Sequence, residues 1–165
     1  AEEEKRQNNV AFENMSEEIA KVVKTIKTKF PEVSTTNTGL GSTIFAVKPG
    51  DGSAREQAAS CQRVLGASAN IANEYATKRY RSNLINWGML PFLYKEGDKN
   101  LPFANDDYVF IPDVKKMIQD KLASVKAYAI KKDGTVNEFE LSTGDLTDDE
   151  RKIILAGCLI NFYRG

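Results

Sequence analysis

The 165-residue sequence predicts a single α/β domain with a mixed sheet. Strand-like and helix-like segments alternate over the first two thirds of the chain, which is typical of parallel strands joined by helices. A late pair of alternating runs around an Asp-Gly dipeptide predicts an antiparallel hairpin. With 41% hydrophobic residues, a chain of this length can bury a core without disulfides or a structural metal.

The N-terminal part is expected to be a lead-in with one helix. The first ten or so residues are polar and lack an apolar period, so we expect no regular structure there. Asn14 or Ser16 can cap the helix that follows, and Pro31 ends it. Its apolar residues recur at helical spacing: Ile19, Val22, Val23, Ile26 and Phe30. We expect residues 1–43 to form this lead-in and residues 44–165 to form the main part of one compact domain.

A strand, a tight loop and a helix come next. Residues 44–47 are a short apolar run typical of a buried strand, and the glycine-rich turn at 49–52 ends it. Residues 53–65 are rich in helix formers, and Gly66 is suited to end that helix. Residues 67–111 repeat the alternation, with a strand at 69–72, a helix at 75–87 that ends at Gly88, an apolar run at 89–94, a surface excursion at 95–107 and a strand at 108–111. Pro91 places the run at 89–94 at a sheet edge or at the start of a strand.

The C-terminal third of the sequence has the clearest secondary-structure signals. A short helix is expected at 114–122, and the alternating runs 125–130 and 136–141 flank the hairpin signal. Thr147 and Glu150 have the spacing of a capping box, which predicts the start of a terminal helix. The apolar residues of that helix are Ile153, Ile154, Leu155 and Leu159.

The composition excludes several classes of function. The 23 basic and 23 acidic side chains give zero net charge, so we expect no nucleic-acid partner. Histidine is absent, which excludes Ser-His-Asp and Cys-His catalysis and imidazole metal sites within this chain. Cys61 and Cys158 lack metal-binding spacing, so we expect buried or half-buried thiols and no cofactor bound by this chain. With no apolar stretch long enough for a signal peptide or a membrane span, we expect a cytoplasmic protein with no membrane partner.

The loop at 50–56, Gly-Asp-Gly-Ser-Ala-Arg-Glu, is the segment best suited to chemistry. Glycines allow close backbone approach, the first N–H groups of the next helix have no internal partners, and Arg55 offers a planar fork that matches a carboxylate. An ordinary turn with a surface arginine explains the same residues equally well. Asp51 and Glu56 are interpreted as a turn residue and a first-turn helix residue.

Three blocks follow one another in order from this loop onward: Gly-Asp-Gly-Ser-Ala-Arg-Glu-Gln-Ala-Ala at 50–59, Arg-Val-Leu-Gly at 63–66, and Ser-Asn-Leu-Ile-Asn-Trp-Gly-Met-Leu-Pro at 82–91. Together they resemble the C-terminal swivel domain of the aconitase superfamily. The family's usual motifs are G-x-G-S-S-R-E-x-A and, further along the chain, N-x-x-x-x-G-L-L-P. The resemblance runs from Ile44 to the C-terminus and implies a swivelling β/β/α domain with a mixed sheet, flanking helices and a late hairpin.

The resemblance also implies a function. Aconitase-like enzymes dehydrate and rehydrate hydroxy-carboxylates at a 4Fe-4S cluster held by cysteines of other domains, over which the swivel domain closes. This chain would then be the swivel domain or small subunit of such a hydro-lyase, inactive alone. Its partners would be the cluster-bearing domains, in the same polypeptide or a large subunit. Carried over by position, Ser53, Arg55 and Gly52 would bind the small hydroxy-carboxylate ligand.

The sequence departs from the family at two places. The second serine of the motif, which serves as catalytic base in the family, is Ala54 here, so no catalytic residue is assigned to this chain. Loss of a general base typically costs on the order of 10²–10⁴ in rate. The Asp- and Arg-bearing stretch that the family places near the start of this domain is not recognisable before Ile44.

Two hypotheses of different classes therefore stay open. The first is the swivel domain of an aconitase-type hydratase. The second is a non-catalytic carboxylate-binding or regulatory module in which Ser53 and Arg55 hold a ligand and Ala54 has ended catalysis. An α/β domain of unrelated function is a third hypothesis.

The remaining polar and aromatic groups have structural interpretations. The basic-aromatic cluster is interpreted as a solvated helix face, and it comprises Tyr75, Lys78, Arg79, Tyr80 and Arg81. Four aromatic residues are expected in the core: Trp87, Phe92, Phe103 and Tyr108. The acidic run 145–150 is explained by helix capping.

Overall fold

The structure, a computed structural model, describes residues 2–97 and 99–164, without the side chains of residues 2–5 and 7. Residue 1 of the expected lead-in, residue 98 of the expected surface excursion and residue 165 at the end of the expected 44–165 region lie outside the described residues. The chain divides into two compact units, which are described separately. Unit 1 comprises residues 1–40, 102–111 and 127–139, and unit 2 comprises residues 41–101, 112–126 and 140–165.

Unit 1 begins with two helices, α1 (Glu2–Glu13) and α2 (Glu17–Lys29). The expectation that the first ten residues lack regular structure is wrong. The amide of Asn8 donates to the carbonyls of Thr35 and Thr38 and accepts from the backbone N–H of Leu40, so distant residues fix α1. The helix expected after Ser16 is confirmed, because the Ser16 side chain accepts from the backbone N–H three residues later.

Unit 1 contains the turn of the predicted hairpin and the parts of its two strands next to that turn. β4 (Tyr108–Phe110) pairs antiparallel with β5 (Ser124–Ile130), and β6 (Val136–Ser142) follows after the turn. In that turn the N–H of Gly134 donates to the carbonyl of Lys131 at 2.9 Å, and the Asp133 carboxylate accepts from the N–H of Thr135 at 2.9 Å. The Asp-Gly signal therefore marks the hairpin correctly.

Unit 2 contains the parallel part of the sheet. β1 (Ser42–Ala46), β2 (Ala67–Ala72) and β3 (Leu90–Leu93) run parallel, and Leu93 of β3 pairs antiparallel with Ser142 of β6. The strand order is β1-β2-β3-β6-β5-β4, which confirms the mixed α/β class. Because β3 lies between two strands, Pro91 is not at an edge; it stands near the strand start, before the pairing with β6.

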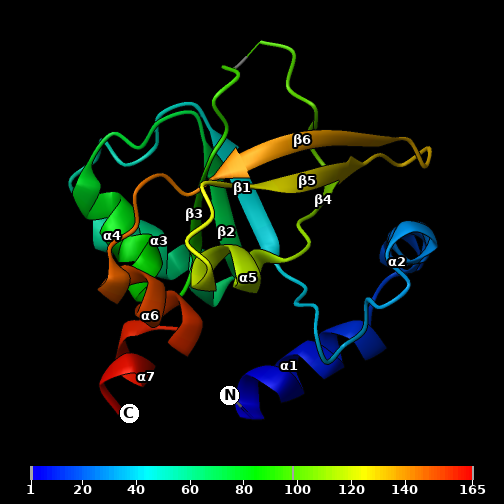
Figure 1. Cartoon of the computed structure of the whole chain (residues 1–165), viewed down its shortest axis with the longest axis horizontal. Coiled ribbons are helices and arrows are strands. Elements are labelled where there is room, and N and C mark those ends of the chain that lie inside the picture. Colours follow the sequence, from blue (N-terminus) through cyan, green and yellow to red (C-terminus); the bar gives the residue numbers. More distant parts are fainter. Residues whose placement is uncertain (1, 98, 165) are drawn as a thin grey trace. The chain divides into compact units, whose positions relative to one another are not determined.

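Five helices of the described part of unit 2 accompany these strands. They are α3 (Arg55–Val64), α4 (Lys78–Asn86), α5 (Val114–Gln119), α6 (Asp148–Ala156) and α7 (Leu159–Arg164). Figure 1 shows α3 and α4 beside β2 and β3. Helices α6 and α7 both contact α4. The helix expected from residue 75 starts later, because Thr77 caps it and its side chain accepts from the N–H of Tyr80.

The terminal helix is interrupted, although one continuous helix was expected. Gly157 adopts a left-handed conformation with φ +91° and ends α6 before α7 begins. Gly88, at the end of α4, lies against the Gly157 carbonyl so closely that a Cβ on Gly88 would overlap it. The capping box predicted at the start of α6 is confirmed.

The core of unit 2 forms two clusters around α4. One contains Ala59, Ala67, Tyr80, Leu84 and Met89, and the other contains Ile85, Ile118, Leu146 and Ile153. Of the aromatic residues expected to be core, Phe92 and Phe103 are buried, whereas Trp87 and Tyr108 are half-buried. The prediction of buried or half-buried thiols is confirmed for Cys158, which is half-buried, and wrong for Cys61, which is exposed.

Candidate functional site

The loop between β1 and α3 is fastened to the segment that follows β2. The carbonyls of Val47 and Pro49 accept from the backbone N–H groups of Glu74 and Ala76 at 3.1 and 2.9 Å. One residue further on, the Gly50 carbonyl accepts from the hydroxyl of Thr77 at 3.2 Å. Three anchors over residues 47–50 therefore fix the chain just before the exposed residues 51–54 of the loop.

Gly50 is required by both conformation and space. Its φ is +97°, a region that side chains disfavour. A Cβ at this position would also come within 2.5 Å of the Cβ of Tyr80. The Tyr80 side chain is held in place at its hydroxyl, which accepts from the side-chain amides of Asn70 and Gln62 at 3.0 and 3.2 Å.

The predicted ligand-binding residues lie on one exposed loop. Gly52 and Ser53 are exposed, and Arg55 is half-buried at the first position of α3. The Nε of Arg55 donates to the Gly50 carbonyl at 3.2 Å. Because Nε is held by the protein, a ligand carboxylate would meet the two terminal nitrogens of the guanidinium.

The N-terminus of α3 lacks a side-chain cap. Its N-cap residue is Ala54, which makes no side-chain hydrogen bond to the helix, whereas α2, α4 and α6 are capped by Ser16, Thr77 and Thr147. The first N–H groups of α3 therefore have no capping oxygen, and the helix dipole gives this end a partial positive charge. The arrangement suits an anion bound beside Arg55.

The two carboxylates near the loop differ. Asp51 is exposed, as a turn residue would be. Glu56 was interpreted only as a first-turn residue, but its carboxylate also accepts from the indole N–H of Trp87 at 2.9 Å. This contact joins the start of α3 to the end of α4, and no local pattern in the sequence predicts it.

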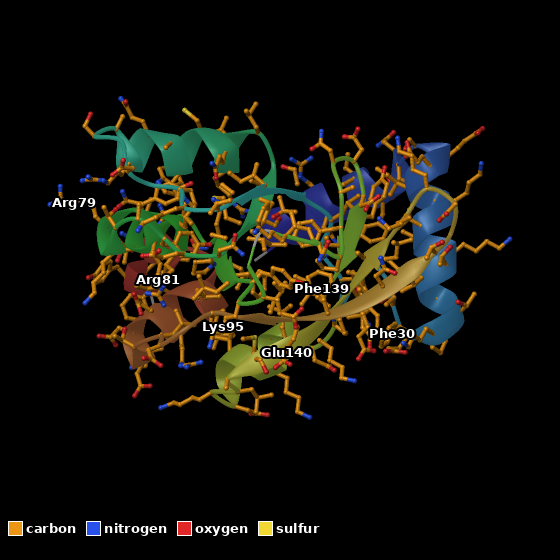
Figure 2. All side chains as sticks on the ribbon, turned by 90° about the horizontal axis from the view of Figure 1, so that it is seen from above. Phe30, Arg79, Arg81, Lys95, Phe139 and Glu140 are labelled. Atoms are coloured by element: carbon orange, nitrogen blue, oxygen red, sulfur yellow. The ribbon has the colours of Figure 1, made fainter. Side chains whose placement is uncertain are left out.

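The basic-aromatic cluster is a solvated face only in part. Lys78 and Arg79 are exposed, and Figure 2 shows Arg79 projecting away from the fold. Arg81 instead pairs with Glu150 at 3.2 Å and donates to the carbonyls of Thr143 and Asp145 at 3.3 and 2.9 Å. The interpretation as a solvated face is therefore wrong for Arg81.

The two tyrosines of the cluster are also structural. Tyr80 is 2% exposed, so the interpretation as a solvated face is wrong for it too. The hydroxyl of the half-buried Tyr75 lies 3.3 and 3.1 Å from the carbonyls of Asn70 and Phe92, either of which can accept its one proton. Burial raises the pKa of Tyr75 far above its usual range, so this hydroxyl stays protonated. Tyr75 therefore contacts strands β2 and β3, and Tyr80 packs against Gly50 of the loop.

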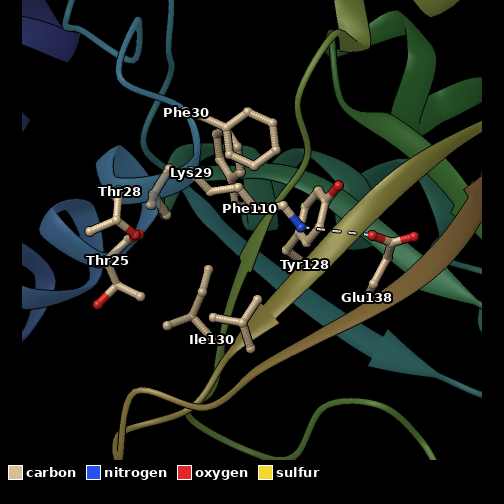
Figure 3. Close-up of a pocket in the computed structure, with 10 residues that line it drawn as sticks. Thr25, Thr28, Lys29, Phe30, Phe110, Tyr128, Ile130 and Glu138 are labelled. Atoms are coloured by element: carbon tan, nitrogen blue, oxygen red, sulfur yellow. Dashed lines mark hydrogen bonds and ion pairs between the residues drawn. The ribbon is translucent and has the colours of Figure 1, made fainter.

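Unit 1 contains a separate surface pocket of about 200 Å³. In Figure 3, Phe30 and Phe110 lie beside Tyr128, and Lys29 reaches toward Glu138. Lys29 Nζ lies 4.4 Å from the centre of the Tyr128 ring and 3.9 Å from the Glu138 carboxylate. The predicted ligand-binding residues do not line this pocket.

Among the described residues, no group of three or more His, Cys, Asp or Glu side chains could hold a metal ion. In the same part of the chain, no helix has the length and apolar character needed to cross a membrane.

A comparison with protein families shows to which family the chain belongs. The family model described as the aconitase C-terminal domain matches residues 4–97, which include the whole loop from β1 to α3 and the helix that supports it. The chain belongs to this family. The match begins well before Ile44, where the resemblance noted in the sequence starts.

Two curated relatives of this aconitase C-terminal domain are both named aconitate hydratase A. The protein from Rickettsia bellii (strain RML369-C) is 30% identical over 127 residues, 75% of this chain and 14% of that protein. The protein from Rickettsia felis (strain ATCC VR-1525 / URRWXCal2) is 31% identical over 121 residues, 72% of this chain and again 14% of that protein. The chain therefore spans about one seventh of the length of these relatives.

Proposed function

We propose that this aconitase C-terminal domain binds a small hydroxy-carboxylate for an aconitase-type hydratase, as its swivel domain or small subunit. The observation that carries the proposal is Arg55, whose Nε is held on the Gly50 carbonyl at 3.2 Å at the uncapped start of α3. An arginine oriented in this way can meet a carboxylate with two parallel charge-assisted hydrogen bonds. Ser53, exposed on the same loop, would add a hydroxyl contact, and Gly52 would allow close approach of its backbone.

The chemistry of the proposed hydratase would be supplied by other domains. The 4Fe-4S cluster that an aconitase-type reaction needs does not fit this chain, because Cys61 and Cys158 are its only cysteines and the described residues offer no metal-binding group. The role of the chain is then to bind and orient the ligand and to cover it. Its partners would be the cluster-bearing domains of the same polypeptide or of a large subunit, in the cytoplasm, with neither nucleic acid nor membrane as a partner.

Ala54 favours a second candidate function. The resemblance puts the family's catalytic serine at this position, and a methyl group cannot take a proton. A carboxylate-binding or regulatory module without catalysis would keep Arg55 and Ser53 and would not need a base. The two candidates differ in turnover, whereas carboxylate binding is common to both.

The test combines citrate binding with hydratase activity, measured without oxygen and with a reconstituted cluster. It uses the longest natural polypeptide that contains this chain, together with any large subunit. Arg55→Ala should weaken citrate binding about 10- to 100-fold, the loss expected for hydrogen bonds to a charged group. Arg79→Ala, which removes an exposed arginine from α4, is the matched control and should leave binding unchanged.

The outcomes separate the candidates. Turnover that falls with Arg55→Ala and rises with Ala54→Ser would support the hydratase and would identify the missing base as the limit on its rate. Absence of turnover in every version, with binding that still depends on Arg55, would overturn the hydratase and leave the binding module. Binding that does not depend on Arg55 would overturn both.

A further inference from the structure

The orientation of Arg55 depends on a carbonyl that is shared between two donors. The Gly50 oxygen accepts from Nε of Arg55 and from the hydroxyl of Thr77, each at 3.2 Å. Thr77 lies at the start of α4, 22 positions after Arg55 along the chain, yet both side chains converge on one atom. A backbone oxygen has two lone pairs, so it can accept both bonds at once.

The direction of the Thr77 bond follows from its other contact. The same hydroxyl accepts from the backbone N–H of Tyr80 at 3.2 Å, as the N-cap of α4. A threonine hydroxyl has one proton to donate, and the Gly50 carbonyl can only accept. The proton of Thr77 therefore points at Gly50, and the cap bond uses a lone pair of the same oxygen.

The Gly50 peptide is restrained on both sides by groups of unit 2. The carbonyl of Pro49, one residue earlier, accepts from the N–H of Ala76, and the ring of Tyr80 leaves no space for a Cβ at Gly50. Thr77 supplies the last of these anchors, directly on the oxygen that holds Arg55. Without it, the Gly50 peptide could rotate and the anchor of Nε would move.

We infer that Thr77 is a positioning residue for the carboxylate-binding arginine, an inference that rests on the proposed function of Arg55. Its hydroxyl fixes the Gly50 carbonyl, the carbonyl fixes Nε, and the two terminal nitrogens of Arg55 are left to receive the ligand end-on. Thr77 acts through Arg55 and does not itself touch the ligand.

A purely structural role as helix cap is the competing explanation, and the chain offers a matched control for it. Thr147 is also an N-cap threonine of unit 2, and its hydroxyl accepts from the backbone N–H of Glu150 at the same distance of 3.2 Å. Thr147→Val removes a cap from α6, just as Thr77→Val removes one from α4. Only Thr77→Val also removes the donor to Gly50.

The experiment measures citrate binding by calorimetry on the longest natural polypeptide that contains this chain, with thermal unfolding of every variant as a check. Thr77→Val should weaken binding about threefold to tenfold, the usual effect of one hydrogen bond, whereas Thr77→Ser should restore it and Thr147→Val should leave it within about twofold. Thr77→Ala removes the same donor without adding a charge, so it should weaken binding to the same extent and replaces Thr77→Val if that variant does not fold.

A double-mutant cycle supplies the decisive readout. In an Arg55→Ala background, Thr77→Val should cause no further loss of citrate affinity, because the effect of Thr77 passes through Arg55. Additive losses would overturn the inference, as would a Thr77→Val variant with unchanged affinity or a Thr147→Val variant with an equal loss. If Arg55→Ala alone leaves affinity unchanged, the proposed function fails first, and that result is distinct from failure of the Thr77 inference.

Discussion

Two helices of unit 2 begin in opposite ways. At the start of α6, the Thr147 hydroxyl accepts from the N–H of Glu150 at 3.2 Å, and the Glu150 carboxylate accepts from the N–H of Thr147 at 2.8 Å and from Arg81 at 3.2 Å. At the start of α3, Ala54 offers no cap, and Ser53 is exposed. Polar groups that satisfy each other stabilise the fold, whereas a helix start without a cap can bind a ligand.

The largest expected effect comes from changing the loop before α3 at Gly50. Gly50→Ala adds a Cβ at φ +97° and within 2.5 Å of Tyr80, so we expect it to lower the free energy of unfolding by about 3 kcal/mol. Urea denaturation measures this loss. The control is Gly52→Ala, whose Cβ would meet nothing within 4 Å and which should change stability by less than about 1 kcal/mol. Equal stability of the two variants would contradict the packing described for Gly50.

A smaller effect is expected at the start of α6. Arg81→Met keeps the aliphatic stem and removes the bonds to Glu150 and to the carbonyls of Thr143 and Asp145, so stability should fall by about 2 kcal/mol. Arg79→Met, on the exposed side of α4, should be nearly neutral. Citrate affinity should not change in the folded Arg81→Met protein, since Arg81 lies outside the loop at α3. A loss of affinity there would show that the two helix starts are not independent.

The smallest effect concerns the pH dependence of α6. A hydrogen bond from Lys121, at 2.6 Å, holds the pKa of Asp148 below its ordinary value of 3.8. A lowered pKa in the folded state contributes stability above pH 3.8, and this contribution is lost as the pH falls through the folded-state pKa. Asp148→Asn should therefore flatten the acid limb of a stability curve recorded from pH 6 downward. Lys121→Met should flatten the same limb, and an unchanged curve in both variants would refute the pairing.

Local sequence signals predicted the parts of the fold that local hydrogen bonds define. Ser16 and the Thr147–Glu150 pair marked helix starts because their side chains bond to N–H groups three residues away. The Asp-Gly turn marked the hairpin because Gly134 can adopt φ +86°. In the candidate site, the sequence identified the loop and Arg55, and their ligand-binding roles stay predictions.

The features that sequence reasoning missed depend on contacts between distant residues. Helix α1 has little apolar pattern, and Asn8 bonds to residues about thirty positions later. Arg81 resembled the exposed Lys78 and Arg79 by charge, but its partners lie in the segment before α6 and in α6 itself. Thr77 could have been found as an N-cap threonine before a helix, whereas its bond to Gly50 has no local signal.

The contact between Gly88 and Gly157 limits how this sequence can drift over evolution. The obstacle to a side chain at Gly88 is the backbone carbonyl of Gly157, which every amino acid possesses. No second substitution at position 157 can therefore make room for a first one at position 88, unlike a pair of core side chains that can exchange volume. A side chain at position 88 therefore cannot be accommodated by a substitution at position 157. It would require the helices at this junction, α4, α6 and α7, to shift.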